Sequence, residues 1–284
     1  MNSKTKNQKE LENILIETKH FFCISHFNGE LDWINSLSRS KYIVYNKSKV
    51  KLDNKINNIR IKNVGYNIYS YLKFIIENYE NLPDTIVFCK DNIFERHIKI
   101  STFISLLRRN IFTCLEENNK RRNFPISVNL SDNSFNEINS SWYKYQYSRK
   151  YFHDFNDFYK FIFKSINIPL FLRYAPGANY IVPKNNILLR SKIFYKNLLK
   201  FISHSQYSCE SHFIERSLYL IWNSNIESSK NMNKIISKTE LEIMNKKLIK
   251  IKNEESIILE KTSQKITFLL GNVYEKLLLK SLKR

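Results

Sequence analysis

The chain contains 284 residues, of which 43% are hydrophobic and 14% aromatic. This apolar content is ample for a packed core, so it excludes an intrinsically disordered chain. The formal net charge of +20 favours a polyanionic partner, such as nucleic acid, an anionic membrane surface or a phosphorylated substrate. The richness in Asn, Ile and Lys and the scarcity of Gly offer a second explanation of the charge, the codon bias of an AT-rich genome.

Cysteine usage and hydropathy predict a cytoplasmic protein. The four cysteines are widely spaced and form no C-x-x-C pair, which favours reduced thiols over a disulfide framework. No apolar run approaches the ~18 residues of a membrane-spanning helix, and the first residues, MNSKTKNQKELEN, lack the apolar core of a signal peptide. The Lys-rich sequence after about residue 225 leaves open a peripheral contact with an anionic membrane.

Short runs of β-branched and aromatic residues alternate with segments whose apolar residues recur at helical spacing. We expect strands at residues 20–27, 41–46, 58–61, 84–91, 169–174 and 178–183. We expect helices at residues 28–37, 65–79, 97–111, 152–166, 185–203 and 210–222. The alternation predicts an α/β fold, with a mostly parallel, Rossmann-like sheet covered by helices on both faces.

Two segments depart from this alternation. Residues 118–152 are polar, irregular and rich in aromatic residues, which predicts a long loop or insertion. From about residue 225 the sequence is Lys-rich and helical, without strand signals. We therefore expect an α/β domain at residues 1–224 and a basic C-terminal helical extension at residues 225–284.

The carboxyl ends of the predicted parallel strands are the expected place for a ligand. His26 ends the first strand, and Asn46 and Lys47 end the second. Asn63-Val64-Gly65 lies between the third strand and the next helix. A glycine there supplies a positive φ or lets the backbone approach a ligand, and the following helix offers free N–H groups to a phosphate. The alternative is an ordinary turn glycine.

Asp91 ends the most hydrophobic predicted strand, and His97 follows within reach. A carboxylate at such a position is typical of a ligand for Mg²⁺ or Mn²⁺, which prefer hard oxygen donors and bridge them to phosphates. A paired D-x-D is absent, because Cys89 occupies the position two residues before Asp91. The alternative role of Asp91 is to cap a helix or a turn.

Glu210 and Glu215 lie near the start of the predicted helix 210–222, and Arg216 follows them. A partly desolvated carboxylate can act as the general base that deprotonates an acceptor hydroxyl. An arginine at this position can pair with Glu215 or clamp a phosphate. Glutamates near a helix N-terminus also suit the helix dipole, which is the structural alternative.

The segment WYKYQYSRKYF (142–152) interleaves aromatic residues with Lys and Arg. Aromatic planes next to cations suit nucleic-acid bases, a nucleotide or a sugar ring. Together with the net charge, this segment supports an alternative function, nucleic-acid binding through a basic surface. The competing explanation is a Tyr-rich surface loop.

With these residues in place, residues about 20–222 resemble a family of bacterial, viral and fungal proteins described as a domain of unknown function. The resemblance follows short motifs in a fixed order, including N-V-G-x-x-x-x-(S/T)-Y-L, P-G-A and a final E-R. In this chain the motifs are Asp32-Trp33, Ile43–Lys47, Asn63–Leu72, Ile75–Asp84, Val87-Phe88, Pro176–Ala178 and Glu215-Arg216.

The order of the N-V-G turn, Asp91 and the late glutamates also resembles the organisation of GT-A-type glycosyltransferases. The resemblance implies transfer of a sugar from a nucleotide-diphosphate sugar, bound with Mg²⁺ or Mn²⁺, to a hydroxyl of a glycan or other acceptor in surface-polysaccharide synthesis. Glu210 or Glu215 would be the catalytic base, and Asp91 and His97 the metal ligands. The candidate donor-binding residues are His26, Asn46, Lys47, Asn63, Gly65, Asp91 and Arg216.

Two positions depart from the GT-A pattern. Cys89-Lys90-Asp91 replaces the D-x-D motif, and Asn46-Lys47 replaces the usual nucleotide-binding aspartate. If Lys47 or Lys90 neutralised the diphosphate, a metal ion would be less necessary. A non-catalytic protein that keeps the fold is therefore a further alternative, and whether the chain is an enzyme stays open.

Overall fold

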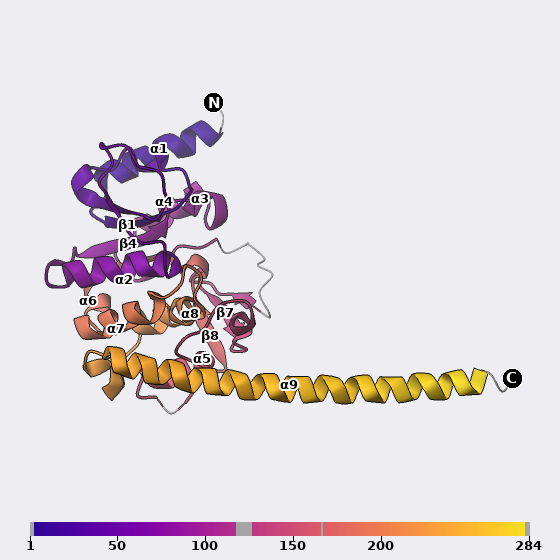
Figure 1. Ribbon diagram of the computed structural model, residues 1–284. Helices are drawn as coiled ribbons and strands as arrows, with labels where there is room; N and C mark the ends of the chain where they lie inside the picture. Colours follow the sequence, from indigo (N-terminus) through magenta and orange to yellow (C-terminus); the bar gives the residue numbers. More distant parts are fainter. Residues whose placement is uncertain (1–2, 118–126, 166, 282–284) are drawn as a thin grey trace. The chain divides into compact units, whose positions relative to one another are not determined.

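The computed structural model describes residues 3–117, 127–165 and 167–281 and divides into two compact units (Figure 1). The first unit runs from Met1 to Ile236 and the second from Ser237 to Arg284. The first is an α/β domain, and the second contains the helix α9 (Lys238–Ser281). The predicted α/β class with a C-terminal helix is therefore confirmed. None of the helices that the structure describes is long and apolar enough to span a membrane.

Among the described residues of the first unit, six strands form a mixed sheet in the order β3-β2-β1-β4-β9-β5. These strands are β1 (Phe21–His26), β2 (Tyr42–Asn46), β3 (Asn58–Arg60), β4 (Thr85–Lys90), β5 (Thr113–Cys114) and β9 (Tyr180–Pro183). The neighbours from β3 to β4 are parallel, as predicted, whereas β9 runs antiparallel to β4 and β5. The exception arises because the chain enters β9 from the carboxyl edge of the sheet, where Tyr180 pairs with Phe88.

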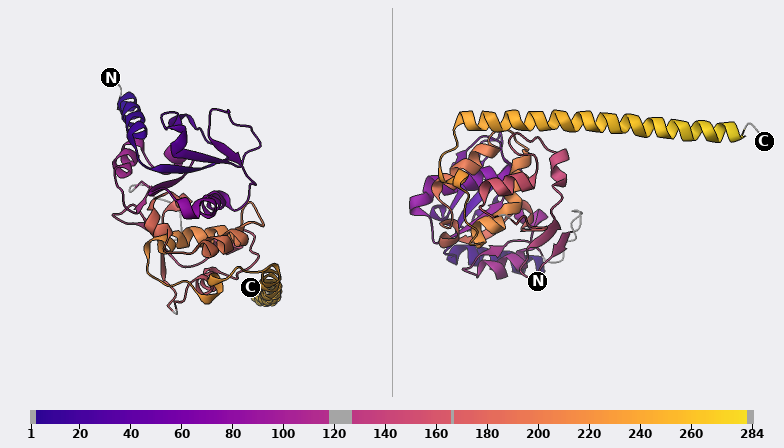
Figure 2. Two further views of the ribbon diagram at one scale, coloured as in Figure 1. Left: turned by 90° about the vertical axis from the view of Figure 1, so that its left-hand side faces the viewer. Right: turned by 90° about the horizontal axis from the view of Figure 1, so that it is seen from below.

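Helices lie on both faces of this sheet (Figures 1 and 2). They are α1 (Ser3–Glu17), α2 (Tyr66–Asn78), α3 (Ile93–Arg96), α4 (Ile100–Leu107), α6 (Lys184–Ile187), α7 (Lys192–Ile202) and α8 (Cys209–Asn223). Phe22 faces α1 and α4 in a core cluster that includes Phe103. Its neighbour Phe21 points to the other face, where its ring stacks 5.3 Å from that of Phe74 in α2. This alternation follows from the two-residue period of a strand.

A second, antiparallel sheet lies beside α8 and contains β6 (Ser127–Asn129), β7 (Phe135–Ile138) and β8 (Phe171–Tyr174). Residues 127–152 are thus partly strand rather than one long loop; residues 118–126 of the predicted insertion lie outside the described residues. Strands β6 and β7 are too short for a sequence period to predict them. β7 also pairs with β8, which follows it in the chain only after helix α5 (Phe155–Ile162).

The first unit ends later than the expected residue 224. Met232 is fully buried and Ile236 is 2% exposed, and the Ser229 N–H donates to the carbonyl of Ile162 in α5. These contacts attach residues 225–236 to the α/β unit. The predicted helix 28–37 is also reduced to a short 3₁₀ turn at Asp32–Ile34.

Candidate functional site

Two neighbouring pockets lie at the carboxyl edge of the sheet, where β1 and β4 end side by side with Ser25 opposite Lys90. Because β9 is antiparallel, its start and the preceding Pro176–Ala178 turn also reach this edge. The larger pocket has a volume of about 370 Å³ and the smaller about 250 Å³. Both are lined by the same four side chains, Tyr66, Asn67, Lys90 and Arg96. The pockets therefore adjoin each other.

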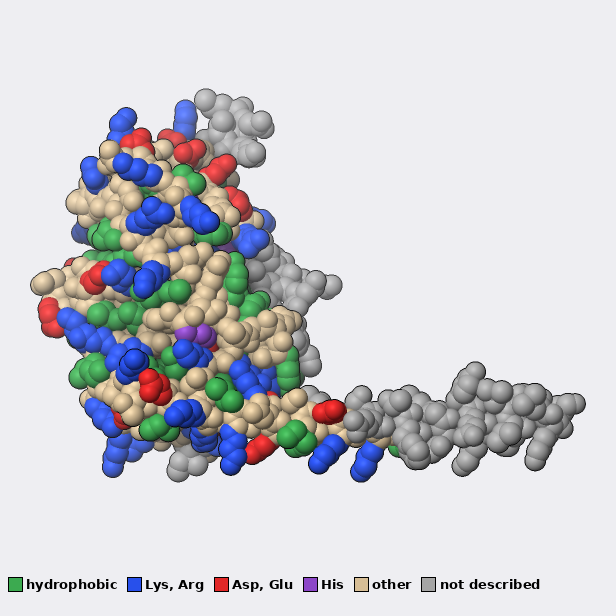
Figure 3. Space-filling model, viewed as in Figure 1, with side chains coloured by type: hydrophobic (Ala, Val, Ile, Leu, Met, Phe, Trp, Pro, Cys, Tyr) green, Lys and Arg blue, Asp and Glu red, His purple; other side chains and the backbone are tan. Residues whose placement is uncertain are grey.

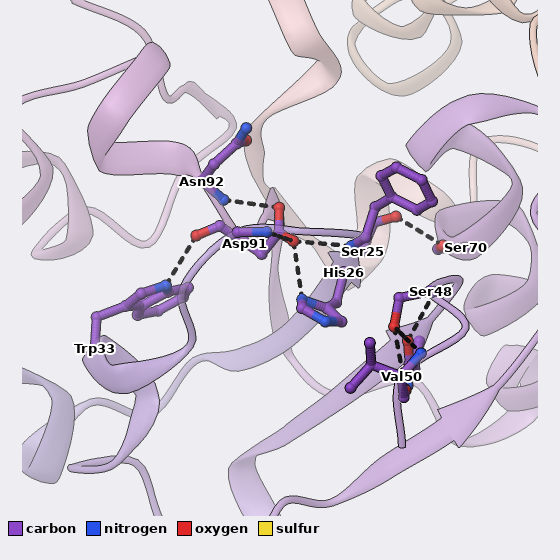
Figure 4. A network of polar contacts seen from close by, with 11 residues as sticks. Ser25, His26, Trp33, Ser48, Val50, Ser70, Asp91 and Asn92 are labelled. Carbon is purple, nitrogen blue, oxygen red and sulfur yellow. Dashed lines mark hydrogen bonds and ion pairs between the residues drawn. The ribbon is translucent and has the colours of Figure 1, made fainter. Parts of the chain in front are cut away.

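Asp91 lines the larger pocket, and Figure 4 shows its polar contacts. Its Oδ2 accepts hydrogen bonds from the Phe27 N–H at 2.8 Å and the Gly29 N–H at 2.7 Å, and lies 2.9 Å from Nδ1 of His26. Its Oδ1 accepts from the Asn92 N–H at 2.8 Å. The carboxylate thus fixes the turn after β1 to the end of β4.

This turn leaves room only for glycine at position 29. A Cβ atom there would lie 2.6 Å from Cγ of Asp91 and 2.9 Å from the Asn92 nitrogen. Burial raises the pKa of Asp91, but His26 and the two backbone donors lower it by more, so the net pKa lies below its ordinary value. Asp91 is therefore an ionised carboxylate that the backbone surrounds.

The Asn63-Val64-Gly65 turn shows why glycine is needed before α2. Gly65 has φ +62°, and a Cβ atom would lie 2.8 Å from Cδ1 of Ile202. The Gly65 N–H donates to the Ser205 carbonyl, and the Tyr66 N–H donates to the Gln206 carbonyl. These two N–H groups therefore bind the loop between α7 and α8 rather than being open to a phosphate.

Lys47 is buried beneath this turn and lines the larger pocket. Its ammonium donates to the Val64 carbonyl at 2.7 Å and to the Tyr66 carbonyl. Burial lowers the pKa of Lys47 to about 7 because desolvation disfavours the charged form. Asn46, by contrast, accepts hydrogen bonds from the N–H and hydroxyl of Ser48 and is not among the residues that line either pocket.

Glu210 lies outside both pockets. Its fully buried carboxylate accepts hydrogen bonds from the backbone N–H groups of Lys150 at 2.6 Å and Tyr151 at 2.8 Å, and it lies 3.0 Å from Nε2 of His204. These contacts hold the segment 142–152 against the start of α8. The geometry therefore gives Glu210 a structural role.

Glu215 and Arg216 line the smaller pocket. Glu215 accepts a hydrogen bond from the Gly177 N–H at 2.6 Å and another from Arg216. Burial raises the pKa of Glu215, but Arg216, His212 and Lys90 lower it much more, so the net pKa lies far below its usual range. Glu215 is therefore ionised, and it is a weak base.

His212 was missed in the sequence, although it lies one helical turn before Arg216. It lines the smaller pocket, and its ring stacks 4.4 Å from that of Tyr147 and 5.5 Å from that of Tyr143. Its Nδ1 lies 3.5 Å from Oε2 of Glu215, and its buried Nε2 has no hydrogen-bond partner among the described residues. Burial lowers the pKa of His212, so the ring is neutral at pH 7.

Asp91 and His97, the predicted metal ligands, line different pockets. His97 lines the smaller pocket, where its Nδ1 lies 2.9 Å from the buried carboxylate of Glu116. The Asp91 oxygens are already occupied by backbone donors and His26. The residues present at Asp91 therefore do not fit a divalent ion.

Of the four residues that line both pockets, the sequence points only to Lys90, as a cation that could replace a metal ion. It gives no indication of Tyr66, Asn67 or Arg96. Asn67 donates to the Gly177 carbonyl at 2.8 Å, and the Lys90 N–H donates to the Asn179 side chain at 3.1 Å. The position of Lys90 at the end of a predicted strand identifies it as a candidate. No local sequence pattern indicates that Tyr66, Asn67 and Arg96 line the pockets.

Comparison with known proteins places the chain in a family. The family model described as "Protein of unknown function (DUF3431)" matches residues 24–238, which is more than half of the chain. No curated protein and no solved structure matches it. The predicted likeness to a domain-of-unknown-function family is therefore confirmed, and the chain belongs to the DUF3431 family.

Proposed function

We propose that this protein is a glycosyltransferase of GT-A-like organisation that transfers a sugar from a nucleotide-diphosphate sugar to a hydroxyl acceptor. The observation that carries the proposal is the pair of adjoining pockets with a shared wall at the carboxyl edge of the sheet. In the strand order β3-β2-β1-β4, the chain adds β2 and β3 on one side of β1 and then β4 on the other side. The order of connection therefore reverses between the parallel strands β1 and β4. In open α/β sheets, ligands bind at such a reversal, and the larger pocket is lined by residues from both strand ends.

The larger pocket suits the donor. Its volume of about 370 Å³ lies within the usual range of small-molecule sites, roughly 300–1,000 Å³. Lys47, Lys90 and Arg96 provide cations for a diphosphate, and Tyr66 and Tyr207 provide aromatic surface for a base or a sugar ring.

The smaller pocket suits the acceptor. Trp142 and Tyr147 line it together with His212, and aromatic planes are suitable surfaces for sugar rings. Because Tyr66, Asn67, Lys90 and Arg96 line both pockets, a donor sugar at this shared wall would lie next to an acceptor hydroxyl. Proximity of this kind lowers the barrier to a two-substrate reaction.

The reaction forms a bond between the acceptor oxygen and the anomeric carbon and breaks the bond from that carbon to the diphosphate. The nucleoside diphosphate leaves with the electron pair, and the acceptor proton goes to a base. We assign that base to His212 rather than to Glu210 or Glu215. His212 Nδ1 lies 3.5 Å from Oε2 of Glu215 and 3.3 Å from Nη1 of Arg216. The assignment requires the tautomer in which Nδ1 carries the proton and faces Glu215 rather than accepting from Arg216, because only then does Nε2 present a lone pair. Glu215 is then a positioning residue.

Calorimetric titration of the full chain with UDP-, GDP- and CMP-sugars tests the donor, with and without Mn²⁺. We expect at least one to bind, and absence of binding at millimolar concentration to all of them would overturn the proposal. With the bound donor, release of the nucleoside diphosphate reports turnover. His212→Asn should lower that rate about 10²–10⁴-fold without weakening donor binding. His153→Asn, the same exchange outside both pockets, is the control.

Nucleic-acid binding has less support. On the face seen in Figure 3, Lys and Arg side chains of the first unit are scattered among acidic and hydrophobic ones rather than gathered in a patch. Tyr143 and Tyr147 pack on His212, and Tyr151 packs on Phe201. The aromatic residues of the segment 142–152 are thus partly used inside the protein. The role in surface-polysaccharide synthesis and the contact with an anionic membrane stay predictions.

A further inference from the structure

We infer that this protein binds the diphosphate of its donor without a divalent metal ion, through Lys90, Arg96 and Lys47. The inference rests on the proposed function and specifies how the donor's charge is neutralised. It departs from the GT-A pattern, in which an aspartate at the end of the strand equivalent to β4 would hold Mg²⁺ or Mn²⁺.

Asp91 has little capacity left for a metal ion. Of the about four acceptor sites of an ionised carboxylate, Oδ2 accepts from the Phe27 and Gly29 N–H groups and lies 2.9 Å from Nδ1 of His26, and Oδ1 accepts from the Asn92 N–H at 2.8 Å. One lone pair of Oδ1 remains. Coordination of a cation by Oδ2 would require breaking these bonds and opening the turn after β1. The tight approach of Gly29 to the carboxylate leaves no space for an ion on that side.

Among the described residues around Asp91, Asn92 has a buried side-chain oxygen without a hydrogen-bond partner, but this is a neutral amide. The positions expected to carry a second acidic ligand or an imidazole supply none to Asp91. Cys89, where the D-x-D motif would have its first aspartate, is fully buried in the core cluster with α1 and α4. His97 is directed to Glu116. The exposed Glu95 is the remaining acidic side chain that lines the larger pocket, so a metal bound there would have to rely on this carboxylate, the phosphates and water.

The larger pocket also supplies cations for the ligand. A nucleotide-diphosphate sugar carries two negative charges, and the basic side chains of Lys47, Lys90 and Arg96 line the pocket. Lys47 is buried with its ammonium at the Val64 carbonyl, and Arg96 can bind phosphate oxygens in a bidentate manner. Asp91 and Glu95 also line this pocket, so its formal net charge is +1 when Lys47 is protonated. The backbone donors and His26 stabilise the charge of Asp91 without removing it.

Lys90 occupies the place where charge develops during transfer. It lines both pockets, and its charge contributes to lowering the pKa of Glu215 and of His212 in the smaller one. A cation at the shared wall is therefore near the bond that breaks. Negative charge that grows on the leaving diphosphate would be stabilised there, which is the role of a metal ion in other enzymes of this chemistry.

Calorimetry of the full chain with UDP and with the panel of UDP- and GDP-sugars, in EDTA and in Mn²⁺, tests the inference. We expect the dissociation constant in EDTA to lie within about threefold of that in Mn²⁺. Lys90→Met and Arg96→Gln should each weaken binding by about tenfold or more, because each removes a charge-assisted contact. Lys62→Met is the matched control, since Lys62 is exposed next to the N-V-G turn but is not among the pocket-lining residues. Glu95→Gln should leave binding unchanged or tighter.

The outcomes separate the two proposals. Binding that requires Mn²⁺, or that is lost in Glu95→Gln, would overturn the metal-free inference and leave the glycosyltransferase proposal intact. Binding in EDTA that Lys90→Met and Arg96→Gln do not weaken would also overturn the inference. Absence of nucleotide binding under both conditions would overturn the proposed function itself. Thermal melting of each variant shows that the chain remains folded.

Discussion

At the scale of single residues, Asp91 links the ends of two neighbouring strands and thereby shapes the larger pocket. We predict that Asp91→Asn lowers the free energy of unfolding by about 3 kcal/mol, because a buried acceptor of several hydrogen bonds is replaced by a group that presents an amide N–H to donors. Chemical denaturation measures the change. Asp84→Asn, at the exposed start of β4, should change stability by less than about 0.5 kcal/mol.

The acid dependence of stability gives this prediction a second readout. The pKa of Asp91 is lowered in the folded protein, so its stabilising contribution is complete above the unfolded value of about 3.9. That contribution is lost as the pH falls through the lower, folded pKa. The stability difference between the wild type and Asp91→Asn should thus be constant above about pH 5 and shrink at more acidic pH. A difference that does not change with pH would argue against an ionised Asp91.

If the proposed donor binds in the larger pocket, we predict that Lys47 makes the affinity dependent on pH. Its pKa in the free protein is about 7 because it is buried, and a diphosphate nearby would raise that pKa by favouring the charged form. Binding above pH 7 therefore takes up a proton. The affinity for a UDP-sugar should be complete below about pH 7 and fall as the pH rises to 8.5, by up to tenfold per pH unit. Calorimetry of the wild type and of Lys47→Met measures this slope, which the variant should lack.

The sequence predicts some of the residues that line the two pockets, but not the contacts that these residues make. Lys47 and Asp91 follow strand ends, Asn63 lies in the turn before α2 and Glu215 lies within α8, and the structure brings them to the two pockets. Their bonding could not be predicted: the partners of Asp91 are backbone N–H groups in a turn more than 60 residues away along the chain. Nothing local distinguishes such a carboxylate from a metal ligand.

At the scale of elements, the turn before α2 depends on Gly65. We predict that Gly65→Ala costs about 2 kcal/mol or more, from the left-handed backbone and from the approach of a Cβ atom to Ile202. Ile202→Ala alone should cost about 2–5 kcal/mol by leaving a cavity. The double variant should lose about 1 kcal/mol less than the sum, since the smaller side chain makes room for the new Cβ. Additive losses in denaturant titrations would show that Ile202 is not the obstacle.

The segment after α8 is an element of the α/β unit. A chain that ends at residue 224 loses the buried side chains of Met232 and Ile236, which contribute about 3–6 kcal/mol together. It also loses the hydrogen bonds of Asn197 with Lys234 and Ile236. We predict that a chain ending at residue 237 unfolds cooperatively and that the shorter chain is less stable by this amount. If the chains that end at residues 224 and 237 were equally stable, the α/β unit would end at residue 224.

Local patterns predict the elements well where they are long. The periods of residues 65–79 and 210–222 correspond to α2 and α8, and the run 84–91 corresponds to β4. The short strands β5, β6 and β7 carry too few residues for a period to be visible. Strands β6 and β7 pair with each other, but β7 also pairs with β8, and β5 pairs with β9. The last two pairings join strands that are distant in the chain and depend on tertiary structure rather than on local sequence.

At the scale of the whole first unit, segments that are far apart in the sequence meet at one edge of the sheet. The alternation of strands and helices predicts that the carboxyl ends of β1, β2 and β4 lie together, and the parallel pairing confirms it. The antiparallel direction of β9 could not be predicted, because the chain returns to the sheet only after β6–β8 and α5. That return brings Gly177 next to Glu215 and so completes the smaller pocket.

Hydrogen–deuterium exchange of the full chain with saturating UDP or GDP shows whether a nucleotide binds at this edge of the sheet. We predict slower exchange in peptides that cover residues 26–29, 63–67 and 90–96, which line or adjoin the larger pocket, and unchanged exchange in α5. Unchanged exchange in those three segments at millimolar nucleotide, or protection confined to other parts of the chain, would contradict it.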